Sequence, residues 1–181
     1  LIEVYRQKHD VAKVDGLYRR LISIENDFVH YRSWIFALSN AERYKEAAAI
    51  CDEYMKKFPT RRRFFLPQLT QIYTYATEKE KAIKAGQEFV RSTPLQAHTR
   101  GNFADHLRKL EEFDRAIKMY KEAIDLTRDG RWKWNWKYKI GLCYRDKGDK
   151  QNVELIMAEL IKTARNARDR GKTEELVKGL D

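Results

Sequence analysis

Apolar residues recur along this chain at helical spacings of three and four, and the same short pattern returns four times. Each copy starts from an Ala or Val, here called the anchor, and continues with mostly apolar residues three, four, seven and eight places later. The anchors are Val14, Ala47, Ala82 and Ala116, and consecutive anchors lie 33 to 35 residues apart. A period of this length predicts stacked helical units rather than one irregular core.

Each repeat is predicted to be a pair of antiparallel helices. In the second copy, an apolar face over residues 28–38 is followed by a polar break at residues 40–42 and a second apolar face over residues 44–54. The small anchor Ala47 is placed where the two helices cross, because a larger side chain would push them apart. The predicted repeats cover residues 1–27 (partial), 28–61, 62–96, 97–130 and 134–167, and a helix within residues 168–181 caps the last one.

This pattern resembles the tetratricopeptide repeat family. The fourth copy keeps Phe103-Ala104, Leu107, Phe113, Ala116, Tyr120 and Ala123 of the family pattern, and Pro59 and Pro94 each follow an anchor by 12 residues. Pentatricopeptide repeats, with a 35-residue period, are the nearest alternative. The resemblance implies an all-α, right-handed superhelix of about five helix pairs, forming one domain over residues 1–181. It also implies that the first helix of each pair lines a concave groove that binds a protein segment.

Composition excludes several other classes. No apolar run approaches the roughly 20 residues that a transmembrane segment needs. The chain has four histidines, and the two that share a predicted helix, His98 and His106, are eight residues apart and too distant to share a metal ion. No nucleotide-binding or hydrolase motif occurs. The sequence therefore predicts no enzyme activity, no cofactor and no metal site.

Two further features concern the protein's context. Cys51 and Cys143 fall on apolar positions of separate repeats, which favours buried thiols in a reducing compartment such as the cytoplasm. The chain begins with Leu1 rather than Met, which indicates a fragment of a longer protein.

The groove residues implied by the resemblance are mostly amides and cations, with Asp105 as the one plain acid among them. Amides bond a peptide backbone, and cations attract carboxylates or phosphates, so an acidic or phosphorylated segment is the favoured partner. For any single residue, an ordinary solvated helix face is the better explanation of the polarity, and it is the near absence of acids from the whole set that favours a binding surface. The candidates are Arg32, Gln68, Gln71, Asn102, Arg108, Tyr138, Lys139 and Arg145.

A cluster of tryptophans precedes the last candidates. Trp132 and Trp136 share one helical face and are expected to pack between the fourth and fifth repeats, whereas Trp134 is expected to stay exposed as an aromatic contact. The groove at these two repeats is therefore expected to bind more strongly than the groove at the second and third.

The net charge of +10 also fits nucleic acid or an anionic surface. Arg61, Arg62 and Arg63 form a basic patch in a turn between repeats and would carry this alternative function. A basic turn is more often a solvated surface, so the sequence favours a protein-binding scaffold over a nucleic-acid-binding protein.

Overall fold

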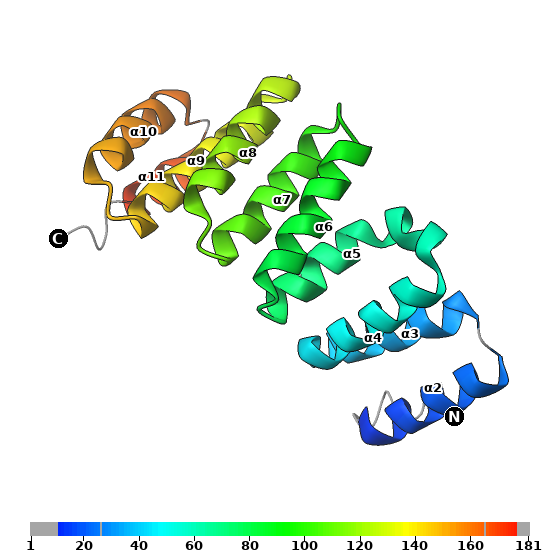
Figure 1. Cartoon of the computed structure of the whole chain (residues 1–181). Coiled ribbons are helices and arrows are strands. Elements are labelled where there is room, and N and C mark those ends of the chain that lie inside the picture. The colour runs from blue at the N-terminus through cyan, green and yellow to red at the C-terminus, as the bar shows by residue number, and fades with distance from the viewer. Residues whose placement is uncertain (1–10, 26, 165, 177–181) are drawn as a thin grey trace. The chain divides into compact units, whose positions relative to one another are not determined.

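The computed structural model describes residues 11–25, 27–164 and 166–176 of the 181-residue chain. Within these ranges the chain forms ten α-helices, one short 3-10 helix and no strand (Figure 1), which confirms the predicted all-α repeat fold. In chain order the helices are α2 (Val11–Ile24), α3 (Phe28–Asn40), α4 (Tyr44–Lys57), η1 (Pro59–Arg61), α5 (Arg62–Tyr75), α6 (Lys79–Ser92), α7 (Ala97–Lys109), α8 (Phe113–Leu126), α9 (Gly130–Asp146), α10 (Lys150–Thr163) and α11 (Ala167–Glu175).

The helices are grouped into two compact units, Leu1–Glu88 and Phe89–Asp181, called unit 1 and unit 2 below. In unit 1, α3 packs between α2 and α4, and α4 also packs against α5. In unit 2, α8 packs between α7 and α9, while α10 packs between α9 and α11. Each unit is thus built from contacts between helices that are neighbours in sequence, as expected for a repeat protein. One continuous domain over residues 1–181 remains a prediction.

Four helical hairpins turn through the same backbone geometry. One residue in each turn has a positive φ, between 57° and 75°, and the next residue donates its backbone N–H to a carbonyl five residues earlier at 2.9 Å. This is the bond that closes a Schellman-type helix end. The positive-φ residues are Glu42, Thr77, Glu111 and Gly148.

The anchor of each repeat lies five residues after this turn residue. The anchors Ala47, Ala82 and Ala116 therefore occupy equivalent places in the second helix of their hairpins. Val153, which is not one of the anchors, occupies this place in the last hairpin, and all four side chains are completely buried. A small side chain at this place allows close contact between helices, which explains the register found in the sequence.

The fifth repeat departs from the others at its first helix. Helix α9 has 17 residues, whereas α3, α5 and α7 have 13 or 14. Residues 131–133, which fall between the fourth and fifth predicted repeats, thus lie inside α9 and lengthen it by about one turn. Asp129 caps the longer helix by accepting a hydrogen bond from the backbone of Arg131 at 2.8 Å.

A final helix covers the end of unit 2. Helix α11 begins at Ala167, one residue before the range 168–181 in which a capping helix was expected, and the side chain of Asn166 caps it. Leu176 is completely buried in a cluster with Trp134, Val153 and Leu160. Leu176 thus packs against the last hairpin, whereas Val177 and Leu180 lie outside the described residues.

Candidate functional site

Unit 1 contains a groove of about 640 Å³ between α3 and α5, which are the first helices of two successive hairpins. Tyr18 and Tyr44 also reach it, from α2 and α4. None of the described residues that line it is acidic, and Arg32 is the one charged residue among them. Helix α3 contributes Arg32, Ser33, Ile35, Phe36, Ser39 and Asn40, and helix α5 contributes Phe65, Gln68, Gln71 and Ile72.

Three polar side chains of this unit 1 groove are available to a partner. Arg32, Gln68 and Gln71 are exposed, and within the described residues none of the three has a hydrogen bond or an ion pair. An unpaired guanidinium can hold a carboxylate through two parallel hydrogen bonds, and primary amides can both donate to and accept from a peptide backbone. Three of the eight predicted groove residues therefore come together at this one site.

Aromatic side chains supply the apolar part of the same groove. Phe36 lies one helical turn beyond Arg32 and is 58% exposed, which is high for so large an apolar side chain. At the C-terminal ends of both helices, Tyr44 stacks on Tyr75 with ring centroids 4.7 Å apart. Phe36 thus lines the groove and is left uncovered.

The corresponding cations of unit 2 are paired within the protein. Lys139 donates to both carboxylate oxygens of Asp105 at 2.6 and 2.7 Å. Asp146 accepts from Arg108 at 3.0 Å and from Arg145 at 3.1 Å, so it joins α7 to α9. A partner's carboxylate would have to compete with these internal acids. The sequence analysis missed Asp146 because it lies just beyond the positions expected to face the groove.

The other two candidates of unit 2 differ from each other. Asn102 is exposed and makes no hydrogen bond within the described residues. Tyr138 instead stacks on the buried Trp134, with the ring centroids 5.8 Å apart. The Nζ of Lys172, from α11, lies over the Tyr138 ring at 5.7 Å from its centroid. Burial raises the pKa of the Tyr138 hydroxyl. Tyr138 thus belongs largely to the packing against the capping helix.

The expectation that Trp134 is exposed is wrong. Its side chain is only 5% exposed, and its Nε1 donates to the carbonyl of Leu160 at 3.3 Å. Trp136 is buried against α7 as expected, and Trp132 is partly exposed beside it, with His98 4.4 Å from the Trp132 ring. Trp134 faces the opposite side of α9, towards α10 and α11, because the capping helix creates a second core there.

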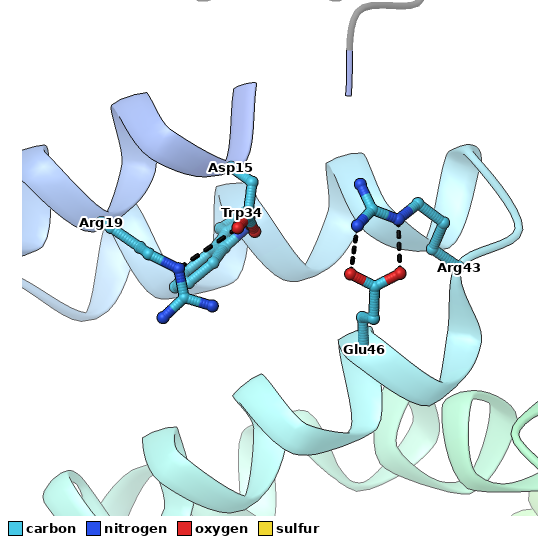
Figure 2. A network of polar contacts seen from close by, with 5 residues as sticks. All are labelled: Asp15, Arg19, Trp34, Arg43 and Glu46. Atoms are coloured by element: carbon cyan, nitrogen blue, oxygen red, sulfur yellow. Dashed lines mark hydrogen bonds and ion pairs between the residues drawn. The ribbon is translucent and has the colours of Figure 1, made fainter. Parts of the chain in front are cut away.

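Four buried aromatic side chains share an arrangement in which a cation of the protein is paired internally. In each, the aromatic N–H or O–H donates to a carboxylate, and a cation pairs with that carboxylate while lying 4.8 to 5.9 Å from the ring centroid. Figure 2 shows the first of these aromatic–carboxylate–cation triads, beside the ion pair of Arg43 and Glu46. The triads are Trp34–Asp15–Arg19, Tyr31–Glu53–Lys57, Tyr73–Asp52–Lys81 and Tyr120–Asp105–Lys139.

The basic patch is also partly used inside the protein. The Arg61 guanidinium lies 4.7 Å from the centroid of the Phe28 ring, and Arg62 donates to Glu88 at 2.8 Å. The side chain of Arg63 lies outside the described residues. These contacts reduce the charge that the patch can offer to an anionic surface.

The described residues show no constellation typical of an enzyme. They contain no group of three or more His, Cys, Asp or Glu side chains that could hold a metal ion. Burial raises the pKa of the Cys143 thiol to about 12 and raises that of Cys51 further, so neither is an activated nucleophile. None of the described helices is long and apolar enough to span a bilayer.

Comparison with known proteins agrees with this architecture. Residues 99–131, in α7 and α8, match the model of the Tetratricopeptide repeat family. A MamA structure (41-end) from Desulfovibrio magneticus RS-1 is 14% identical and superimposes with a TM-score of 0.66, covering 91% of both chains. YrrB, described as a TPR protein with an unusual peptide-binding site, is 12% identical with a TM-score of 0.67, covering 96% of this chain and 88% of its own. No curated protein sequence matches this chain significantly.

The helical hairpins, their common turn and the buried anchors define an α-helical repeat protein. The family match identifies the hairpin of α7 and α8 as a tetratricopeptide repeat. The identities are low, so the similar structures establish the fold and leave the partner to be argued from the groove itself.

Proposed function

We propose that this protein is a non-catalytic scaffold that binds a segment of a partner protein in the unit 1 groove. The observation that carries the proposal is the unpaired set of Arg32, Gln68 and Gln71 beside the exposed Phe36. Interface energy usually concentrates at arginine and aromatic anchors surrounded by weaker polar contacts, and this groove offers both kinds of anchor. YrrB, a protein of similar fold, is described by its peptide-binding site, which supports the same class of ligand.

Site-specific photocrosslinking in cells or lysate tests this proposal. A benzophenone amino acid placed at Gln71, inside the groove, should crosslink the protein to a discrete partner band. The same amino acid at Lys118, an exposed position on α8 of unit 2, is the matched control. Equal crosslinking at both positions, or none at Gln71, would count against a partner in this groove.

Binding of RNA or of an anionic surface through Arg61–Arg63 is the competing function. Nuclease treatment before crosslinking separates the two, because a protein partner survives it and a nucleic-acid partner does not. Recovery of mainly nucleic acid, lost when Arg61 and Arg62 are changed to Gln, would reverse the ranking.

A further inference from the structure

The unit 1 groove presents its chemistry as two rows of side chains. Arg32, Phe36 and Asn40 follow one another at intervals of four residues along α3, so they share one face. Gln68 and Gln71 form the facing row on α5. Tyr75 is the last residue of α5, and Tyr44, on which it stacks, begins α4 shortly after the end of α3. The C-terminal ends of α3 and α5 therefore lie on the same side, and both rows run in the same direction.

The spacing of the α3 row matches one kind of ligand. Side chains four residues apart on a helix are about 5–6 Å apart at their Cβ atoms. In an extended peptide, residues i and i+2 point to the same side and lie about 6.6–6.8 Å apart. A peptide lying along α3 can therefore place one side chain at Arg32 and the next side chain on that face at Phe36.

The charge of the groove selects between anions. Its described lining includes Arg32 as the one cation and no carboxylate. A single guanidinium matches the single charge and the two oxygens of a carboxylate. A phosphate group carries nearly two charges and is usually held by several cations, which this groove does not supply.

From this geometry we propose that the unit 1 groove recognises an extended partner segment in which an acidic residue and a large apolar residue are separated by one residue. The acid pairs with Arg32 and the apolar side chain covers Phe36. The amides of Gln68 and Gln71 bond the backbone of the segment from the α5 side. The proposal rests on the proposed function and adds the sequence pattern that the partner must carry.

Selection from a random linear-peptide display library against the full chain tests this pattern. The wild-type protein should enrich peptides with Asp or Glu two positions from Phe, Leu, Ile, Trp or Tyr. Arg32→Glu should replace the enriched acid with Lys or Arg at the same spacing, and Phe36→Ser should remove the apolar preference while keeping the acid. Arg145→Glu, which changes a cation of unit 2, is the matched control and should enrich the wild-type pattern.

Affinities of an enriched peptide, measured by fluorescence anisotropy, complete the test. Arg32→Glu and Phe36→Ser should each weaken binding at least tenfold, and replacing the acid by phosphoserine should not tighten it. Tighter binding of the phosphopeptide would overturn the choice of a carboxylate. Enriched peptides with another spacing would overturn the pattern, and so would loss of the wild-type enrichment in Arg145→Glu. Either result would still be compatible with a scaffold that binds peptides. Failure to enrich any peptide would contradict the pattern and the proposed function together.

Discussion

Single residues link neighbouring helices through the aromatic–carboxylate–cation triads. Tyr120 on α8 and Lys139 on α9 both bind Asp105 on α7, so one carboxylate connects three helices. In another triad, the hydrogen bond from Tyr31 holds the pKa of Glu53 below its usual range. A carboxylate that is bound in this way is stabilised in its charged form. A partner's carboxylate would have to displace it to reach the paired cation.

Close packing at one glycine gives the first prediction. A Cβ atom at Gly101 would lie 2.4 Å from Nε1 of Trp136, whose side chain is 2% exposed and has no room to retreat. Gly101→Ala should therefore lower the free energy of unfolding by about 1–3 kcal/mol through overpacking. Urea denaturation followed by circular dichroism measures this.

Gly16 provides the matched control for that substitution. It lies in α2 with open space where a Cβ would be, so Gly16→Ala should leave stability unchanged or raise it by up to about 1 kcal/mol. Equal effects of the two substitutions would mean that Trp136 does not pack on Gly101.

A buried histidine gives the second prediction. Burial lowers the pKa of His106, with the nearby Asp105 acting in the opposite direction, and its Nδ1 is buried without a hydrogen-bond partner in the described structure. Below about pH 6.5, the unfolded chain takes up a proton at this position more readily than the folded chain. This contribution to stability is present above pH 6.5 and is lost as the pH falls through the lower pKa of the folded state.

Denaturation between pH 7 and pH 5 tests the histidine. The free energy of unfolding should fall more steeply with decreasing pH in the wild type than in His106→Gln. An unchanged slope in His106→Gln would show that this group does not titrate differently on folding.

The helical elements end in a shared turn, and three of the four turns place a residue other than glycine at a positive φ. Such a residue costs roughly 1–2 kcal/mol relative to glycine in this region. The side chain of Glu111 is exposed and makes no hydrogen bond or ion pair within the described residues, so Glu111→Gly should raise the free energy of unfolding by about 1 kcal/mol.

The reverse change at the equivalent position is its control. Gly148 has φ 75° and open space around its Cα, so Gly148→Ala should lower stability by a similar amount. Thermal unfolding of both variants measures the difference. A loss of stability in Glu111→Gly would mean that the glutamate side chain contributes more than its backbone conformation costs.

The same elements show what sequence can and cannot predict. Helical spacing and the small anchors predict the hairpins, because burial of an apolar face and close crossing depend on local patterns. The burial of Trp134 was not predictable, since it depends on the position of α11, which local patterns do not determine. The pairing of Arg145 with Asp146 escaped prediction for a related reason, because Asp146 is the last residue of α9 and its orientation depends on how that helix ends.

At the scale of the whole molecule, the charge of +10 does not translate directly into a nucleic-acid site. Many cations are paired with carboxylates of the protein, as at Lys139 and Arg62, and net charge mainly affects long-range attraction. Because Arg32 is the one cation among the described residues of the unit 1 groove, the free energy of binding should depend on one ion pair and on apolar contact.

Salt dependence follows from this count of charges. The logarithm of the affinity for a display-selected acidic peptide should fall with the logarithm of salt concentration with a slope of about −1 or shallower, since one ion pair forms. Each phosphate contact to single-stranded nucleic acid contributes about −0.7, so a site with several contacts gives a much steeper slope. Anisotropy titrations from low to high sodium chloride measure this, and a slope beyond about −3 would indicate a polyanion-binding surface.

The most direct test of the account is to locate the bound peptide by nuclear magnetic resonance. Side-chain amide and guanidinium N–H signals can be followed individually while a selected peptide is added. Peptide binding in the unit 1 groove should shift the signals of Arg32, Asn40, Gln68 and Gln71, whereas that of Asn102 should not shift. Shifts confined to Asn102, Arg108 and Arg145 would contradict it, because the binding site would then lie on unit 2.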